Sequence, residues 1–185
     1  MKSLIVDNFF DDFSYIYNEI KKLKFYSLKE FNSKFNQKQT WPGTRTEILP
    51  KVNLKLSEHI VHQFFKKAKG FLDNSKVKIE MYAHQRDKKF SKKDWIHNDL
   101  CVGDYTCLIY LSKHNLNSGT KFYNTKKQVI NDVKFVQNRA LIFDSRYLHS
   151  AYGHHNGRTN IILSFKSDVI AGNIDNRNQP IARTI

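Results

Sequence analysis

The segment WIHNDLCVGDYTCLIYLS (residues 95–112) decides the fold. Its second half, Tyr105–Ser112, is apolar and rich in aromatic and β-branched side chains, which favours a buried strand. Further short strands are predicted after it, separated by Gly, Asn and Asp: Thr120–Asn124, Val133–Gln137, Ala140–Asp144 and Asn160–Lys166. Many short strands joined by such turns are typical of a β-sandwich or barrel.

The chain before this segment predicts a supporting layer that contains helices. Leu4-Ile5-Val6 favours a short strand, and apolar residues recur with helical spacing in Phe13–Leu23 and again in Ser57–Leu72. From Lys76 the period changes to two, since Val77, Ile79 and Met81 alternate with polar residues, which predicts another strand. We expect the two helices to pack on the outer face of one sheet.

Residues 25–50 lack a clean period. Trp41-Pro42-Gly43-Thr44-Arg45-Thr46 predicts a turn that leads into a strand through Ile48 and Leu49, which Pro50 ends. Trp41 and Arg45 are candidate substrate contacts, and the alternative is a loop that packs on the barrel. Arg146, in a later loop, is a third substrate candidate.

The length of 185 residues predicts one domain over 1–185. Residues of about 1–75 would form the supporting strand and helices, about 76–168 the β core, and 169–185 a polar tail. Hydrophobic residues make up 40% of the chain and aromatic residues 14%, which indicates a globular protein.

A possible metal site combines residues that are distant along the chain. His97-x-Asp99 lies at the edge of a predicted strand region, and His149 ends a strand and turn about 50 residues later. Two histidines and one carboxylate are the facial triad that holds Fe(II) and leaves open positions for chemistry. His154 and His155 compete with His149 as the distal ligand, and either of His97 and Asp99 could instead be an ordinary loop residue.

Arg158 lies nine residues after His149, at the start of the last predicted strand. Its guanidinium could bind a carboxylate through two parallel hydrogen bonds. The alternative is a surface charge after Gly157.

In this context the chain resembles the 2-oxoglutarate/Fe(II) oxygenase superfamily, and within it the prolyl-4-hydroxylase-like group. The resemblance covers about Lys78 to Ser167 and rests on features in a fixed order: His97-x-Asp99, Thr106–Ser112, Ser118-Gly119-Thr120-Lys121-Phe122, Asn138–Phe143, Leu148-His149-Ser150 and Gly157-Arg158. The chain departs from the family pattern at Ser112, Ser118 and Lys121. Those are structural positions, so the departures leave the ligand set intact.

The resemblance implies a double-stranded β-helix, which is a cupin-like jelly roll. His97, Asp99 and His149 would bind Fe(II), and Arg158 would pair with the distal carboxylate of the cosubstrate 2-oxoglutarate. Tyr110 would donate a hydrogen bond to that carboxylate. Tyr82 would be a second polar contact, or else a core aromatic residue, and Leu108 an apolar wall.

The implied activity is that of a dioxygenase that uses O2 and decarboxylates 2-oxoglutarate to succinate and CO2. The substrate would be a prolyl or another amino-acid unit, within a peptide or protein or free. A non-catalytic jelly-roll binding module is the alternative from another class of function.

The net charge of +14 and the pI of about 9.7 raise nucleic acid or a ribosomal component as an alternative partner. No nucleic-acid-binding motif supports it, and lysine abundance alone can produce the charge. Nucleic-acid demethylases of the superfamily usually carry a second Arg six residues after the first, where this chain has Ser164.

The cysteines and the apolar segments of the sequence predict a cytoplasmic location. Cys101 and Cys107 are expected to be free thiols, which fits the cytoplasm. No segment is apolar over about 18 residues, so no membrane span is expected. The oligomeric state is left open.

Overall fold

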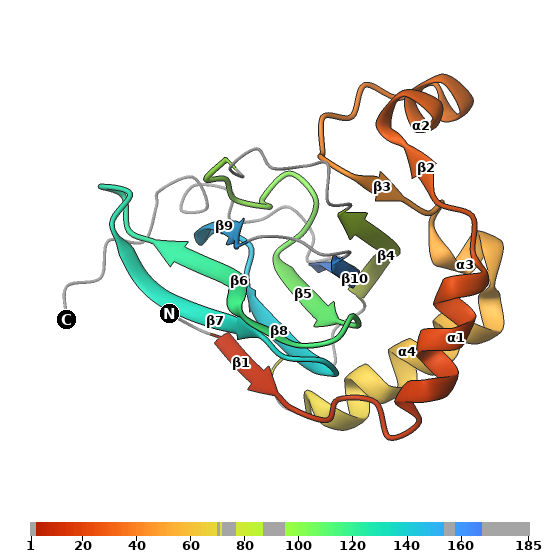
Figure 1. Ribbon diagram of the computed structural model, residues 1–185, viewed down its shortest axis with the longest axis horizontal. Coiled ribbons are helices and arrows are strands. Elements are labelled where there is room, and N and C mark those ends of the chain that lie inside the picture. The colour runs from red at the N-terminus through yellow and green to blue at the C-terminus, as the bar shows by residue number, and fades with distance from the viewer. Residues whose placement is uncertain (1–2, 70, 72–76, 87–94, 154–157, 168–185) are drawn as a thin grey trace.

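The computed structural model describes residues 3–69, 71, 77–86, 95–153 and 158–167 (Figure 1). The predicted tail at 169–185 and the competing ligands His154 and His155 lie outside these residues. The elements in chain order are β1 (Ser3–Val6), α1 (Phe13–Lys22), β2 (Tyr26–Ser27), α2 (Leu28–Phe35), β3 (Thr44–Arg45), α3 (Leu49–Val52), α4 (Leu54–Lys67), β4 (Val77–Arg86), β5 (Tyr105–Tyr110), β6 (Asn115–Tyr123), β7 (Val129–Phe135), β8 (Arg139–Asp144), β9 (Leu148–Tyr152) and β10 (Arg158–Ser167).

Two antiparallel sheets form the β core. The larger has seven strands in the order β1-β8-β5-β10-β4-β3-β2, and the smaller has three in the order β7-β6-β9. The β core begins with β4, yet β1, β2 and β3 from the N-terminal part extend the same large sheet. Several neighbours, such as β10 and β4 or β6 and β9, are distant in sequence, as in a jelly roll, and the predicted fold class is confirmed.

Strand alternation divides the apolar residues between two cores. On β5, Cys107 and Ile109 face the helices, whereas Leu108 and Tyr110 face the small sheet. Side chains point to opposite faces along a strand, so this division follows directly from the sequence. The inner core is completed by residues of β6, β7 and β8, namely Phe122, Val133, Phe135, Leu141 and Phe143.

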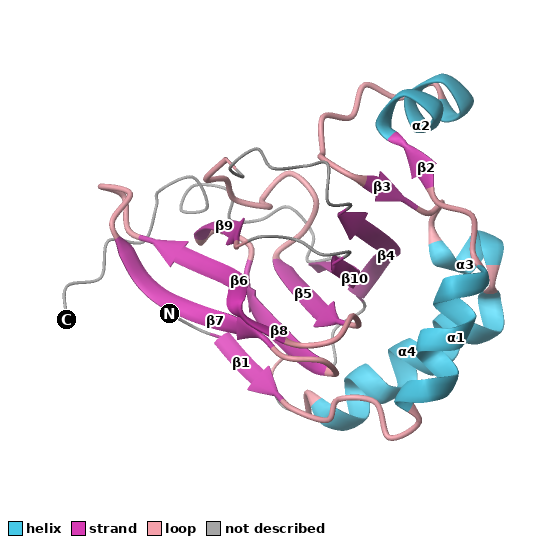
Figure 2. Ribbon diagram, in the orientation of Figure 1, coloured by secondary structure: helices cyan, strands magenta, loops and turns pink. Residues whose placement is uncertain are grey.

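Helices α1 and α4 cover the outer face of the large sheet, as predicted (Figure 2). Each presents an apolar stripe to it, with Ile16 and Ile20 buried on α1 and Ile60 and Phe64 buried on α4. The ring of Phe64 stacks on Phe165 of β10, with 4.4 Å between centroids. Among the described residues, no helix has the length and apolar character needed to cross a membrane.

Within residues 25–50 the sequence analysis missed one helix and made one wrong prediction. Leu28–Phe35 forms helix α2, which begins at a capping box in which Ser27 and Glu30 exchange hydrogen bonds. The strand expected through Ile48 and Leu49 is instead the start of α3. Pro50 lies in the first turn of that helix, where its missing N–H costs nothing.

Candidate functional site

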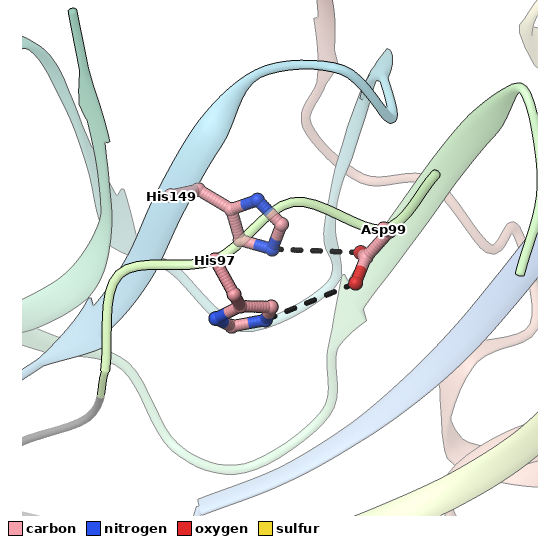
Figure 3. Close-up of side chains that lie close together, drawn as sticks. All are labelled: His97, Asp99 and His149. Carbon is pink, nitrogen blue, oxygen red and sulfur yellow. Dashed lines mark ion pairs between the residues drawn. The ribbon is translucent and has the colours of Figure 1, made fainter. Parts of the chain in front are cut away.

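Backbone pairing brings His97 and His149 together (Figure 3). Their backbones form an isolated bridge, in which the N–H of His97 donates to the carbonyl of His149 at 3.0 Å and the reverse bond measures 2.8 Å. His149 lies on β9, a strand that the sequence did not predict. The N–H of Asp99 donates to the carbonyl of Ser145 at 2.9 Å, which attaches the ligand loop to the turn after β8.

The three candidate ligands converge. One ligand atom from each of His97, Asp99 and His149 lies within 4.8 Å of the others. The Nε2 atom of His97 is 3.8 Å from Oδ1 of Asp99, and the Nε2 atom of His149 is 3.5 Å from Oδ2 (Figure 3). Each histidine therefore directs the same ring nitrogen toward the carboxylate.

Hydrogen bonds on the opposite ring nitrogens select the tautomer. Nδ1 of His97 lies 3.0 Å from the carbonyl oxygen of Trp95, and Nδ1 of His149 lies 3.0 Å from that of Tyr147. A carbonyl oxygen can only accept, so both Nδ1 atoms carry the proton and both Nε2 atoms keep a lone pair. Metal-binding histidines are commonly oriented in this way. The donor set thus fits a divalent transition metal.

Thr106 holds the carboxylate of Asp99 and Ser145 contacts Thr106, and the sequence analysis predicted neither residue. The hydroxyl of Thr106 donates to Oδ2 of Asp99 at 3.0 Å, and the Ser145 hydroxyl lies 3.0 Å from that of Thr106. Both residues are buried. Period two along β5 places Thr106 on the same face as Leu108 and Tyr110, and this signal could have found it.

Arg158 lies at the start of β10, as predicted, and only 5% of its surface is exposed. Nη1 donates to the carbonyl oxygen of Gly119 at 3.0 Å, and the guanidinium lies over the rings of Tyr110 and Phe135 at 5.2 and 4.9 Å. A Cβ at Gly119 would lie 2.1 Å from the carbonyl oxygen of Val133, so the pairing of β6 with β7 requires glycine at this position. A buried guanidinium of this kind is suited to pairing with an anion.

Tyr110 supports this end of the site from behind. Its side chain is fully buried, and its hydroxyl lies 2.8 Å from the hydroxyl of Thr120. Thr120 lines the pocket, whereas Tyr110 is not among the lining residues. Burial raises the pKa of Tyr110, which keeps its hydroxyl protonated and able to donate. The sequence did not single out Thr120.

One pocket of about 230 Å³ joins the triad to most of the other predicted residues. Arg158, Tyr82, Leu108, Trp41 and Arg45 line it together with His97, Asp99 and His149. Asn160 and His84 line it as well, and the sequence reading had not selected them as site residues. They lie two residues from Arg158 and Tyr82 along their strands, so alternation could have indicated both.

The three substrate candidates have different surroundings. The guanidinium of Arg45 lies between two rings, with its Cζ atom 3.8 Å from the centroid of Tyr82 and 4.5 Å from that of Trp41. Burial lowers the pKa of Arg45 and raises that of Tyr82. Arg146 is not among the lining residues, and its guanidinium forms an ion pair with Asp144.

His84 is a buried histidine in the pocket wall. Burial, followed by the charges of neighbouring arginines, lowers its pKa to about 3. Its Nε2 lies 2.5 Å from the carbonyl oxygen of Pro42, so that nitrogen carries the proton. Gly43 follows with a φ of 98°, and a Cβ there would lie 2.3 Å from the carbonyl oxygen of Gln85. Glycine is therefore required in the turn that brings Trp41 and Pro42 onto β4.

No family model matches the sequence, and no curated protein matches it. Solved structures do match. A prolyl 4-hydroxylase from Phytophthora capsici aligns with a TM-score of 0.62 and 12% identity over 90% of this chain and 59% of its own. An oxidoreductase of the 2OG-Fe(II) oxygenase family from Burkholderia pseudomallei gives 0.63 and 11%, over 89% and 84%. HygX from Streptomyces hygroscopicus, with nickel, 2-oxoglutarate and hygromycin B bound, gives 0.61 and 12%, over 91% and 84%.

This chain has the 2OG-Fe(II) oxygenase fold. The resemblance noted in the sequence thus extends to nearly the whole chain at the level of structure. Within this oxygenase fold, the His97–Asp99–His149 cluster and Arg158 occupy a common pocket between the two sheets.

Proposed function

We propose that the chain is an Fe(II)- and 2-oxoglutarate-dependent oxygenase that hydroxylates an amino-acid unit, with a prolyl unit as the first candidate. The observation that carries this proposal is the convergence of His97, Asp99 and His149 within 4.8 Å, in the same pocket as a buried arginine. Bound Fe(II) and 2-oxoglutarate would supply the oxidising chemistry, in which O2 is consumed and succinate, CO2 and a hydroxylated product are formed.

The chain's residues would hold the metal through Nε2 of both histidines and the carboxylate of Asp99. The carbonyl oxygens of Trp95 and Tyr147 keep each imidazole in the tautomer that presents a lone pair. The Thr106 hydroxyl keeps the Asp99 carboxylate turned toward the two rings. Two imidazoles and one carboxylate match the ligand set of non-haem Fe(II) oxygenases, which supports the choice of iron.

Arg158 would bind the distal carboxylate of 2-oxoglutarate. Thr120 lines the same pocket, where its hydroxyl would be a second donor, and Tyr110 would act through Thr120 and keep that hydroxyl oriented. Leu108 and Ile162 also line the pocket and would pack against the methylene groups of the cosubstrate. A buried dicarboxylate requires such a cation and donor to compensate its desolvation.

Anaerobic binding followed by exposure to O2 tests this function. Wild-type protein should bind one Fe(II) and one 2-oxoglutarate, and should release succinate slowly when O2 is added. His97→Ala should lose Fe(II) binding, because one of three ligands is removed. Fe(II) retained in full by that variant, or no succinate from the wild type, would overturn the proposal.

Arg158→Gln separates the cosubstrate site from the metal site. Loss of hydrogen bonds to a charged partner costs about 1.5–3 kcal/mol, so the dissociation constant of 2-oxoglutarate should rise by about 10- to 150-fold. Fe(II) affinity should stay unchanged. Arg139→Gln removes the same charge from a residue that pairs with Asp7 outside the pocket, and it should alter neither affinity.

A further inference from the structure

Arg45 is a second cation in the pocket, and its position differs from that of Arg158. It lies on β3, opposite His84 of β4, and β4 pairs in turn with β10. Arg45 lines the same pocket as the proposed metal ligand Asp99. The two arginines therefore approach the cavity from different strands.

Within the described part of the chain, the guanidinium of Arg45 has no carboxylate and no hydrogen-bond acceptor as a partner. Its Nε atom is buried and unpaired, as is the Oδ1 atom of Asn160 in the same wall. The rings of Trp41 and Tyr82 lie over the guanidinium. Such ring contacts stabilise the faces of a guanidinium, whereas carboxylates bind its in-plane N–H groups. The ring contacts therefore position Arg45 without satisfying its donors.

The number of carboxylates in the pocket indicates what the N–H groups of Arg45 bind. Asp99 is the one carboxylate among the described lining residues, and the proposed function assigns it to the metal. The proposed function also assigns Arg158 to 2-oxoglutarate, so no carboxylate of the described lining residues remains for Arg45. A desolvated cation without a counter-ion is unfavourable, and burial already lowers the pKa of Arg45.

The size of the pocket limits the ligand. At about 230 Å³ it lies below the roughly 300–1,000 Å³ of pockets that enclose drug-sized ligands. A pocket of this size favours a small molecule or unit over a drug-sized ligand.

We propose that the substrate is a free amino acid whose carboxylate pairs with Arg45. The proposal rests on the function proposed above and narrows its substrate class. A residue inside a peptide chain has no α-carboxylate to offer, so a guanidinium held in this position discriminates against it. A neutral ligand would leave the buried Arg45 guanidinium without a counter-ion, and it should therefore bind more weakly than a carboxylate.

The test uses the wild-type protein with Fe(II) and 2-oxoglutarate under anaerobic conditions. Each of the common L-amino acids is titrated by calorimetry and by thermal shift, and each that binds is compared with its carboxamide. We expect at least one acid to bind, and its carboxamide to bind about 10- to 100-fold more weakly, since one charge-assisted pair is lost. Equal binding of acid and carboxamide, or no binding by any acid, would overturn the proposal.

Variants locate the effect. Arg45→Gln should weaken binding of the acid to the level of the carboxamide, and Arg45→Lys should retain part of the affinity because the charge is kept without the planar fork. Arg139→Gln serves as the charge-matched control and should bind the acid as the wild type does. In both Arg45 variants the affinity for 2-oxoglutarate should remain within about threefold of the wild-type value. Loss of a guanidinium that binds 2-oxoglutarate directly would lower that affinity by much more.

Failure of this inference can be told apart from failure of the proposed function. If the wild type binds Fe(II) and 2-oxoglutarate and releases succinate but binds no amino acid, the function stands and the substrate class is wrong. If Arg45→Gln weakens 2-oxoglutarate as strongly as Arg158→Gln does, Arg45 belongs to the cosubstrate site and the inference is overturned.

Discussion

Thr106→Val should weaken Fe(II) binding although Thr106 is not a metal ligand. Valine has nearly the same shape as threonine, so the substitution removes the hydroxyl and leaves the packing of β5 in place. The lost hydrogen bond is the one that the Thr106 hydroxyl donates to Oδ2 of Asp99 at 3.0 Å. Thr106 itself has no exposed surface. Ser145 also loses its hydroxyl partner at 3.0 Å.

The magnitude follows from the charge of the acceptor. A hydrogen bond to a charged group is worth about 1.5–3 kcal/mol, and loss of a group that orients a metal ligand typically costs about 10- to 100-fold in affinity. We therefore expect the Fe(II) dissociation constant to rise by about 10- to 100-fold. Anaerobic titration against a competing chelator measures it directly.

Thr46→Val is the matched control. Thr46 is buried as well, and its hydroxyl accepts the N–H of Ala83 at 3.0 Å. This variant should lose about 1–3 kcal/mol of unfolding free energy and keep the Fe(II) affinity of the wild type. If the two variants bind Fe(II) equally well, the Thr106 hydroxyl does not orient the Asp99 carboxylate for metal binding.

Two further predictions concern stability. The pKa of His84 is lowered to about 3, so between about pH 6.5 and 3 the unfolded state takes up a proton that the folded state does not. The unfolding free energy of the metal-free protein should therefore decrease as the pH is lowered through that window, by up to about 1.4 kcal/mol per pH unit. Urea titrations at several pH values should show a smaller decrease for His84→Gln than for the wild type. Parallel pH curves for the two proteins would contradict this prediction. Asn138→Ala should cost about 2–4 kcal/mol in urea unfolding, because the Asn138 side chain pairs with both the N–H and the carbonyl of buried Phe10. Asn36→Ala, at another left-handed position that is exposed, should cost less, and equal losses would show that backbone conformation alone matters at Asn138.

Local apolar patterns predicted the elements that have a helical stripe or a continuous apolar run. The stripe through Ile16 and Ile20 indicated α1, and the strong apolar run of 105–112 indicated β5. Helix α2 was missed although its capping box, Ser27 to Glu30, is readable in the sequence. It is short and none of its residues is fully buried, so the apolar signal was weak.

The candidate metal ligands and Arg158 could be named from spacing, since each lies in a motif with a fixed order along the chain. Their contacts could not. Thr106 reaches Asp99, and Ser145 reaches both, only because β5 pairs with β8 in a register that sets Thr106 opposite Phe143. A sequence carries no direct record of such long-range registers.

Residue types, strand periods and the order of the motifs were thus determined by the sequence, because they depend on local chemistry and on neighbours a few positions away. The tertiary structure decided which of several similar residues share the pocket. The sequence suggested both Arg45 and Arg146 as substrate contacts, yet Arg45 lies between Trp41 and Tyr82 in the cavity and Arg146 pairs with Asp144. The physical reason is that a side chain's partners depend on which strands pair and in what register, and non-local contacts set that pairing.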